Sequence, residues 1–338
     1  MRQSVSDKII AYYHAHARTL PWRLPPGSNA RPDPYRVWLS EVMLQQTTVA
    51  TVAPRYAEFL ERWPSVEALA DSPLEELLVA WAGLGYYARA RNLHACARLV
   101  ATRGGFPETE AELRALPGIG DYTAAAIAGI AFGADSVVID TNVERVVARL
   151  IALDRPIREA RPTIRDVATS LYENVDSGTL AQALMDLGAT ICRPREPRCD
   201  ACPVRADCAA FATGDPASYP PRPARKEKPE RHGTVWWSER DGSVFLIRRP
   251  AKGLLGGMAA LPGTDWIDGS PPATERTITH GFTHFRLALT VEERADPPDE
   301  PTGWWQPLDR LDEAGLPTLY AKAARLALAR QKSLPLTP

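Results

Sequence analysis

The sequence of 338 residues lacks any apolar run close to the roughly 20 residues that a membrane-spanning helix needs. Its first residues, MRQSVSDKII, carry charges where a secretory signal peptide would have an apolar core. We therefore expect no membrane partner and a cytoplasmic location, in a bacterial-type cytosol or nucleoid.

The sequence also lacks an excess of positive charge. The 40 Lys and Arg residues face 41 Asp and Glu residues, which leaves a formal net charge of −1. This balance excludes a protein-wide positive field, so any binding of nucleic acid must be local. Hydrophobic residues make up 45% of the chain and charged residues 24%, as in a globular protein long enough for two or three domains.

Cysteine is scarce, and four of the five residues crowd into one short segment. Cys192, Cys199, Cys202 and Cys208 are spaced Cys-x6-Cys-x2-Cys-x5-Cys, which in a reducing compartment indicates metal binding more than disulfides. Four thiolates could hold a [4Fe–4S] cluster or a structural Zn²⁺. The presence of a single Cys-x2-Cys pair favours iron–sulfur, with zinc as the alternative. Cys96, on an apolar helix face, is expected to be buried.

Hydrophobic periodicity changes along the chain. Helical spacing runs to about residue 190 and predicts a mostly α domain over 1–213, with helices at 5–17, 35–48, 50–62, 74–82, 87–102, 121–132, 142–152, 161–175 and 179–191. The segment 214–232 is rich in Pro and charge and is expected to be a linker. Beyond it, strands at 234–238 and 243–248 flank Arg240-Asp241-Gly242, a hairpin signal, and apolar residues alternate over a third strand at 285–292. With a helix at 319–330, these strands predict an α+β domain over 233–338.

The stretch 116–147 combines a Gly-rich turn with an acid. Gly118 and Gly120 permit a tight turn and expose backbone N–H groups at a helix start, where a phosphate can bind. Asp140 follows an apolar run and precedes a helical pattern. It could present a carboxylate to a bound nucleic acid, or it could be part of a helix cap, although Thr141 and Glu144 already have capping-box spacing.

This turn, the acid and the cysteine loop, in this order, resemble the helix-hairpin-helix DNA glycosylases of the endonuclease III superfamily. Within that group, SEVMLQQTTV at 40–49, WAGLGYYARARNL at 81–93 and the second domain resemble the MutY-type adenine DNA glycosylases. The resemblance implies a multidomain protein, with a helix-hairpin-helix glycosylase domain whose loop 192–208 carries a [4Fe–4S] cluster and a MutT/nudix-like C-terminal domain.

The implied activity is base-excision repair. Adenine mispaired with 8-oxoguanine or G would be removed from double-stranded DNA, by an enzyme that we expect to be a monomer. Tyr122 occupies the position where bifunctional relatives carry a Lys that forms a Schiff base with the sugar. A tyrosine cannot form an imine, so we expect a monofunctional glycosylase.

The resemblance assigns the chemistry to two acids. Glu41 would protonate adenine at N7 and later handle water, and Asp140 would stabilise the sugar cation. Burial next to Leu39 and Val42 would raise the pKa of Glu41, whereas a helix N-terminus favours the ionised form of Asp140. Without the resemblance, Glu41 could equally be a solvated helix residue.

Other family positions surround these acids. Arg23, Tyr122 and Asn142 match residues that line the adenine pocket or the reacting sugar. Asn142 could instead be an ordinary first-turn helix residue, and Glu144 and Arg145 could pair locally.

DNA contacts are implied at further positions. Gln46 and Tyr86 match residues that wedge into the duplex, with Thr47 close to the oxidised base and the Gly118–Gly120 turn on a phosphate. The sequence does not separate Tyr86 from Tyr87, since either could be a core aromatic.

In the second domain, Phe282-Thr283-His284 matches a Phe-Ser-His loop that probes 8-oxoguanine. Thr283 keeps the hydroxyl donor of the serine and adds a methyl group. Nudix hydrolysis needs a Glu-rich helix that holds Mg²⁺, yet 250–276 contains only Glu275, so we expect recognition without hydrolysis.

Two alternatives stay open. A pyrimidine-lesion glycosylase/lyase is disfavoured by Tyr122 and by the second domain. A noncatalytic, metal-stabilised DNA-binding module would keep the turn and the cysteines but would need neither Glu41 nor Asp140.

Overall fold

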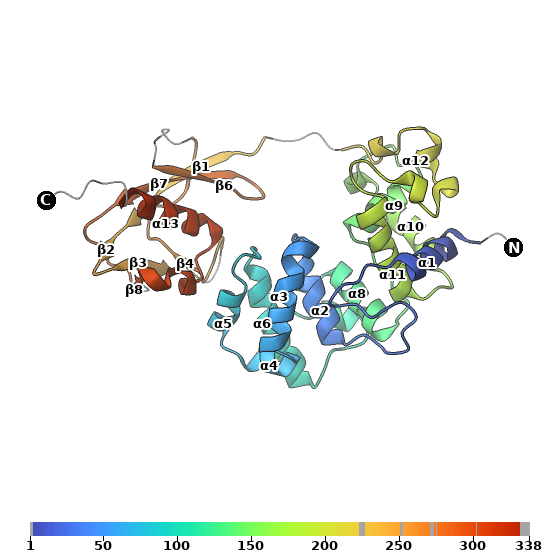
Figure 1. Cartoon of the computed structure of the whole chain (residues 1–338), viewed down its shortest axis with the longest axis horizontal. Helices are drawn as coiled ribbons and strands as arrows, with labels where there is room; N and C mark the ends of the chain where they lie inside the picture. Colours follow the sequence, from blue (N-terminus) through green and yellow to red (C-terminus); the bar gives the residue numbers. More distant parts are fainter. Residues whose placement is uncertain are drawn as a thin grey trace. The chain divides into compact units, whose positions relative to one another are not determined.

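The computed structural model describes residues 3–222, 227–250, 253–270, 274, 276–301 and 303–331, and the chain divides into two compact units (Figure 1). The first unit comprises the described residues of Met1–Asp71 and Asn92–Ala224, and the second those of Ser72–Arg91 and Arg225–Pro338. The predicted domain boundaries stay a prediction. Residues 223–226 of the predicted linker and 332–338 of the predicted second domain lie outside the described residues.

Regular structure in the described part of the first unit is helical throughout. Its α-helices are α1 (Val5–His16), α2 (Pro34–Leu44), α3 (Val49–Arg62), α4 (Val66–Asp71), most of α6 (Ala88–Arg103), α7 (Glu110–Arg114), α8 (Asp121–Phe132), α9 (Thr141–Leu150), α10 (Arg161–Tyr172), α11 (Ser177–Asp186) and α12 (Ala209–Ala212). A π-helical turn, Leu187–Ile191, extends α11. The sequence did not predict α4 and α7, because 6 and 5 residues are too few to show a helical period.

The core of this unit lies where α1, α8, α9, α10 and α11 meet (Figure 1). Val143, Val146 and Val147 of α9 are buried at helical spacing, and Leu180 and Leu184 of α11 face the same cluster. Helix α8 packs against both α2 and α11. This central helix therefore joins the part of the unit that carries α2 to the part that carries α9.

Helix α9 begins differently from the prediction. Its N-cap is Asp140, whose Oδ1 accepts the Val143 N–H at 2.7 Å. The predicted capping box of Thr141 and Glu144 is wrong, because Thr141 is already the first helical residue. Asp140 is thus fixed by the helix that it caps.

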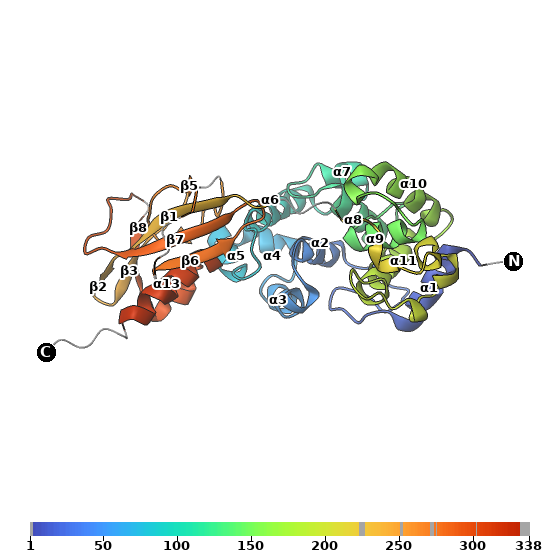
Figure 2. The same cartoon turned by 90° about the horizontal axis from the view of Figure 1, so that it is seen from above.

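The second unit contains two sheets. The strands are β1 (Glu230–Trp237), β2 (Glu239–Arg240), β3 (Ser243–Arg248), β4 (Ala259–Ala260), β5 (Ile267–Asp268), β6 (Thr277–Gly281), β7 (Arg286–Glu293) and β8 (Gly303–Pro307). One sheet has the order β5-β1-β7-β6, with β1 parallel to β7; in the other, β3 pairs with β2, β4 and β8. Helices α5 (Leu74–Ala80) and α13 (Thr318–Gln331) belong to the same unit, and α13 packs on the β1-β7-β6 surface (Figure 2).

The predicted strands are present, but the first pairs differently from the expectation. Residues 234–238 were expected to form a hairpin with 243–248, yet β1 pairs with β5 and β7, and the hairpin joins β2 to β3. Asp241 and Gly242 have φ of +52° and +69°, as a two-residue hairpin turn requires. In β7, Leu287, Leu289 and Val291 are buried as the alternating pattern predicts, but Ala288 between them is buried as well.

Helices in the described parts of the chain all fall short of the length and apolar character needed to cross a bilayer. Glu275, the one glutamate of 250–276, lies outside the described residues.

Candidate active site

Glu41 lies in the buried half of α2. The helix begins at Asp33, whose side chain caps the Tyr35 N–H at 2.8 Å, and Pro34 fills its first position. Glu41 is 7% exposed. Burial raises the pKa of its carboxyl group from 4.5 to about 7, against the opposing effect of a hydrogen bond from Tyr122. The direction agrees with the prediction from sequence.

Tyr122 reaches Glu41 from the first turn of α8. Its hydroxyl donates a hydrogen bond of 2.6 Å to Glu41 Oε2. Burial, and then the nearby negative charges of Glu41 and Asp140, raise the pKa of Tyr122 well above its usual value. The phenol therefore stays protonated and serves as a fixed donor that orients the Glu41 carboxyl group.

Asp140 has both carboxylate oxygens engaged. Oδ1 accepts the Val143 N–H, and Oδ2 accepts the Asn142 side-chain amide at 2.7 Å. Negative charge is favoured at a helix N-terminus. Asp140 also lies near enough to Glu41 for its charge to raise the pKa of that residue. Asp140 therefore both caps helix α9 and lies near Glu41, the second acid of the site.

Arg145 fixes Asn142 in turn. Its Nη2 donates to Asn142 Oδ1 at 2.8 Å and to the Gly188 carbonyl at 2.7 Å, while its Nε donates to the Cys192 carbonyl at 2.8 Å. A continuous set of hydrogen bonds thus joins Asp140 to the start of the cysteine loop. The alternative of a local pair is not what the contacts of these residues show, since Glu144 lies 4.0 Å from Arg161.

One signal for the position of Arg145 is local in the sequence. Asn142 and Arg145 are three residues apart on α9 and so lie on one face. Its other partners, Gly188 and Cys192, lie 43 and 47 residues away along the chain, which no local pattern reveals.

Arg23 is held in an ion pair. Its Nη1 lies 2.6 Å from Asp186 Oδ1, and its side chain is 8% exposed. The guanidinium is close enough to lower the pKa of Glu41. Trp22 beside it is buried, as expected. Asp186 was missed by the sequence reasoning.

The Gly-rich turn precedes α8. Gly118 has φ of +75°, and a Cβ there would lie 2.7 Å from Asn92 Cβ. The left-handed backbone and the lack of room for a side chain therefore both require glycine at this position. Gly120 is the N-cap of α8 and has no side chain to accept from the first N–H groups of that helix. These groups point where an anion could bind.

Gln46 and Tyr86, the two predicted wedge residues, both have a left-handed backbone, with φ of +56° and +48°. Such strain in residues other than glycine clusters at functional sites. Gln46 follows α2 and is exposed, and Thr47 Oγ1 donates to the Gln45 carbonyl at 3.3 Å. The first unit thus presents a strained, exposed residue directly after the helix of Glu41.

The structure separates the two tyrosines of the second unit. Tyr86 is 51% exposed and Tyr87 is 5% exposed, so Tyr87 is the core aromatic. The Tyr86 hydroxyl lies 3.0 Å from Thr283 Oγ1. Phe282 stacks on Phe285 at 4.8 Å and anchors a loop whose next two residues, Thr283 and His284, are exposed.

The four clustered cysteines lie around a buried arginine. Arg149, 2% exposed, donates from Nη1 to Cys192 Sγ at 3.3 Å and to the Arg193 carbonyl at 2.7 Å. Burial raises the pKa of Cys202 to about 11, and each of the other three thiols adds to that rise, so the four sulfurs lie near one another. Cys96 is fully buried elsewhere, as expected.

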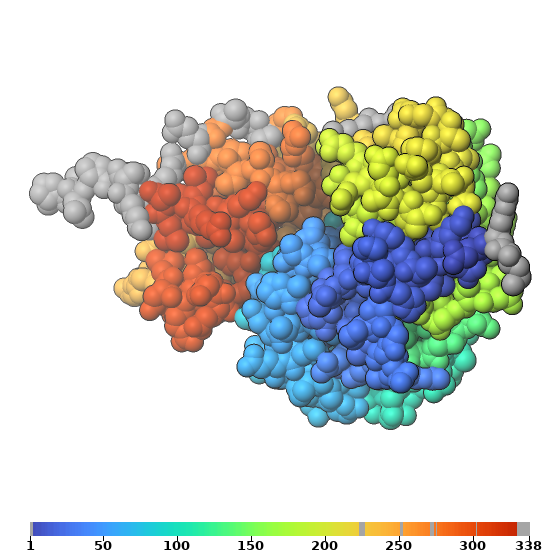
Figure 3. All heavy atoms as spheres, turned by 45° about the vertical axis from the view of Figure 1, so that its right-hand side comes forward, coloured from blue at the N-terminus to red at the C-terminus, as the bar shows by residue number. Residues whose placement is uncertain are grey.

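By their chemistry the four thiols suit a sulfur-liganded metal group, because a bound cation would offset the burial that disfavours the thiolates, but their arrangement is not that of a formed site. Among the residues described, no three Cys, His, Asp or Glu side chains form a group that could hold a metal ion. The loop is tied to helix α1 by an ion pair of 2.7 Å between Lys8 and Asp207, and Figure 3 shows the two segments side by side at the surface.

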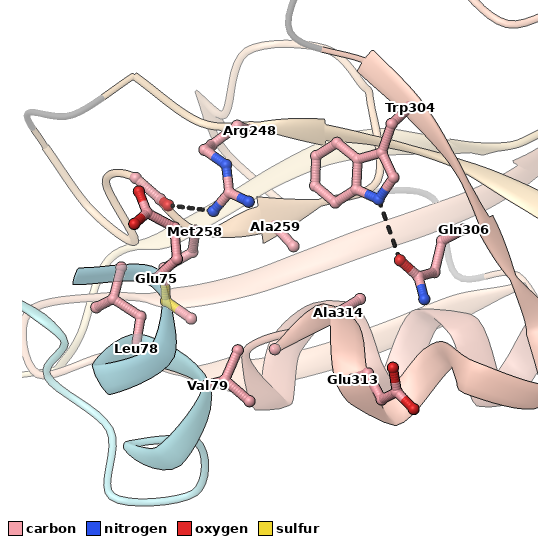
Figure 4. A pocket seen from close by; sticks show the side chains of 12 residues that line it. Glu75, Leu78, Val79, Arg248, Met258, Ala259, Trp304, Gln306, Glu313 and Ala314 are labelled. Atoms are coloured by element: carbon pink, nitrogen blue, oxygen red, sulfur yellow. Dashed lines mark hydrogen bonds between the residues drawn. The ribbon is translucent and has the colours of Figure 1, made fainter. Parts of the chain in front are cut away.

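A hollow of about 150 Å³ lies in the second unit between α5 and the sheet of β3, β4 and β8 (Figure 4). Val79, Met258 and Trp304 form part of its lining. The Trp304 Nε1 donates to Gln306 at 3.1 Å, and Arg248 donates to the Gly257 carbonyl at 3.1 Å. Two of its polar side chains, Trp304 and Arg248, thus bond to other lining residues.

Comparison with known proteins defines the class of this chain. Residues 39–167 match the family described as HhH-GPD superfamily base excision DNA repair protein, and residues 234–326 match the NUDIX domain. The structure of a thermostable thymine-DNA glycosylase is similar, at 28% identity and a TM-score of 0.54, over 62% of this chain and 95% of that chain. The fold and the site thus define a helix-hairpin-helix base-excision repair protein that also carries a nudix domain.

Curated relatives narrow the class. The adenine DNA glycosylase of Mycolicibacterium smegmatis is 41% identical over 217 residues, which cover 62% of this chain and 70% of that protein. The human adenine DNA glycosylase is 32% identical over 356 residues, covering 84% of this chain and 65% of that protein. The chain belongs to the adenine DNA glycosylase family. It spans between about half and two thirds of the length of several curated relatives that it matches.

The predictions of family and fold class are confirmed by these matches.

Proposed function

We propose that the chain hydrolyses the N-glycosidic bond of adenine mispaired with 8-oxoguanine or G in double-stranded DNA. The observation that carries the proposal is the buried Glu41 with a 2.6 Å hydrogen bond from Tyr122, and with Asp140 near enough for its charge to raise the pKa of Glu41. Relatives named adenine DNA glycosylase support the removal of adenine, and the choice of mispair is part of the proposal.

Glu41 acts as the general acid. Adenine leaves readily only when it is protonated, and a donor works best when its pKa lies near the working pH. The pKa of Glu41, raised to about 7 by burial, meets that requirement. Because Tyr122 donates to Oε2, Oε1 is the oxygen that carries the proton to N7 of adenine.

Asp140 stabilises the cationic sugar that forms as the bond breaks. An ionised carboxylate with both oxygens held by hydrogen bonds needs little reorganisation when positive charge develops beside it. Water then adds to the sugar carbon, and Glu41, now ionised, takes up the proton of the water. The products are free adenine and an abasic site.

Strand cleavage does not follow. Tyr122 stands where a lysine would attack the sugar, and its hydroxyl is bound to Glu41. A phenol cannot form the imine that precedes β-elimination. The enzyme is therefore monofunctional.

The DNA contacts belong to exposed or strained segments. The backbone N–H groups after Gly118 and Gly120 bind a phosphate, and Gln46 and Tyr86 fill the space left by the extruded adenine. Thr47 and the loop Phe282-Thr283-His284 contact 8-oxoguanine. The enzyme binds the duplex as a monomer.

Cys192, Cys199, Cys202 and Cys208 hold a [4Fe–4S] cluster. Held by these four thiolates, a cluster would cross-link the loop 192–208, whose start Arg145 ties to Asn142. Brown purified protein with bound iron and sulfide supports this assignment, and colourless protein with zinc contradicts it.

A single-turnover excision assay tests the proposal. Duplexes with adenine opposite 8-oxoguanine, adenine opposite G, and a damaged pyrimidine are compared under enzyme excess. We expect rapid release from the first, slower release from the second and none from the third. Preferred removal of the damaged pyrimidine, or efficient β-lyase activity on an abasic duplex, would contradict the proposal.

A further inference from the structure

Asp186 is a buried acid shared by two arginines. Its Oδ1 lies 2.7 Å from Arg18 Nε and 2.6 Å from Arg23 Nη1, and its Oδ2 accepts the Arg18 backbone N–H at 2.9 Å. The Asp186 side chain is 8% exposed. Buried carboxylates with this many charge-assisted bonds have a fixed position.

Arg23 connects Asp186 to the site of Glu41. Its positive charge lies close enough to Glu41 and to Tyr122 to lower the pKa of both, and it also bonds to the Tyr13 hydroxyl. Three groups thus face Glu41 from three segments: Tyr122 from α8, Asp140 from the start of α9, and Arg23 from the chain before α2.

The place of Asp186 in the chain gives it a second connection. It is the last residue of α11, and its carbonyl accepts the Thr190 hydroxyl at 2.8 Å inside the π-helical turn. Gly188 in that turn accepts from Arg145, and a Cβ at Gly188 would lie 2.6 Å from Asn142 Cβ. This turn therefore lies beside both hydrogen-bond networks, since Thr190 bonds to Asp186, the ion-pair partner of Arg23, and Gly188 packs against Asn142, which bonds to Asp140. π-helical turns of this kind are frequent at functional sites.

From this geometry we infer that Asp186 is a positioning residue, which holds the Arg23 guanidinium beside Glu41 for adenine excision. The inference rests on the proposed function. Arg23 has only one carboxylate partner among its described contacts, so loss of that partner frees the guanidinium to move. A displacement of about 1 Å next to reacting groups can lower a rate by about 10²-fold.

The test is a double-mutant cycle on single-turnover adenine excision. Wild type, Asp186→Asn, Arg23→Met and the double variant are compared at saturating enzyme. We expect Asp186→Asn to lower the rate constant about 10- to 100-fold. We expect it to add little to Arg23→Met, because both changes remove the same charge from the site.

The pH profile separates positioning from mere support of the fold. Without Arg23 in place, Glu41 loses a nearby positive charge and its pKa rises, so the fall in rate at alkaline pH moves to higher pH in both single variants. Asp176→Ala is the matched control. It removes the N-cap of the same helix, where Asp176 accepts the Thr179 N–H at 2.7 Å, and leaves Arg23 untouched.

Two arginines facing a neutral amide could prevent folding. In that case Arg18→Gln combined with Asp186→Asn removes one of the two positive charges and is measured in the same way. The inference is overturned if the rate constant and pH profile of the folded variant equal those of wild type, or if the effects of Asp186 and Arg23 substitutions add fully. Wild-type protein that releases no adenine from any mispair overturns the proposed function as well, and so separates the two failures.

Discussion

The acid site of the first unit and the Thr283 loop of the second differ in how firmly their functional groups are held. Glu41 is buried, and Asp140 has a hydrogen bond on each carboxylate oxygen. Thr283 and His284 are exposed, and the Thr283 hydroxyl lies in contact with the hydroxyl of the exposed Tyr86. Cleavage of a glycosidic bond needs charged groups that are already in place around the transition state, whereas recognition of a base needs side chains that are accessible to the DNA. Substitutions in the first region should therefore act on rate, and those in the second on preference.

The largest expected effect is loss of excision in Glu41→Gln and Asp140→Asn. Each removes one charge-bearing group while keeping the shape, so we expect the single-turnover rate constant to fall by about 10³-fold or more. Duplex binding, measured by fluorescence anisotropy, should persist. Glu144→Gln, another acid of the first turn of α9, is the control and should stay within a few-fold of wild type. A near-normal rate constant in either variant would contradict the assignment of that acid to the cleavage step.

Glu41 should also lower the free energy of unfolding at alkaline pH. The folded pKa of Glu41 lies at about 7, above its ordinary value of 4.5, so unfolded protein releases this proton first and stability falls as the pH rises between those values. The difference corresponds to about 3 kcal/mol. We expect Glu41→Gln to gain up to that amount relative to wild type at about pH 8, compared with about pH 4.5. Urea unfolding at the two pH values measures the gain, and an equal offset at both would contradict it.

A smaller effect is expected at Asn142. Its amide holds Asp140 Oδ2 at 2.7 Å, so Asn142→Ala leaves the charge in place but frees its orientation. We expect a rate reduction of about 10- to 100-fold. Thr141→Ala, next to it and exposed, is the control. An effect as large as that of Asp140→Asn would mean that Asn142 itself takes part in the chemistry.

The smallest effect is expected in the exposed loop. Thr283→Ala removes a hydroxyl that contacts Tyr86 and is available to the DNA, so the ratio of rates for adenine opposite 8-oxoguanine and opposite G should fall by about 10-fold or less. Thr283→Ser keeps the hydroxyl and should preserve the ratio. A change in the absolute rates at an unchanged ratio would mean that Thr283 acts on bond cleavage and not on the choice of the opposite base.

Local patterns predicted most helices and the residues that form short motifs. Glycine at 118, the acid at 140 and the four cysteines stand in contiguous segments whose spacing carries their chemistry. Burial of Glu41 also followed from its apolar neighbours, and its raised pKa agrees with that reading.

Contacts between distant segments could not be predicted. Asp186 and Arg23 are 163 residues apart, and nothing in either segment indicates that they meet. The pairing of β1 was predicted wrongly for the same reason. A short-range hairpin signal lies between β1 and β3, but β1 pairs with β7, which is more than 50 residues away along the chain. Short-range signals define elements, while their partners depend on tertiary packing.

The most direct test of the central claim is the pH dependence of single-turnover adenine excision by wild-type protein on a duplex with adenine opposite 8-oxoguanine. If protonated Glu41 is the acid, with its pKa raised to about 7, the rate constant is high in mildly acidic solution and falls as the pH rises through that value. A rate constant that stays level or increases through neutral pH would contradict the assignment of Glu41 as the proton donor.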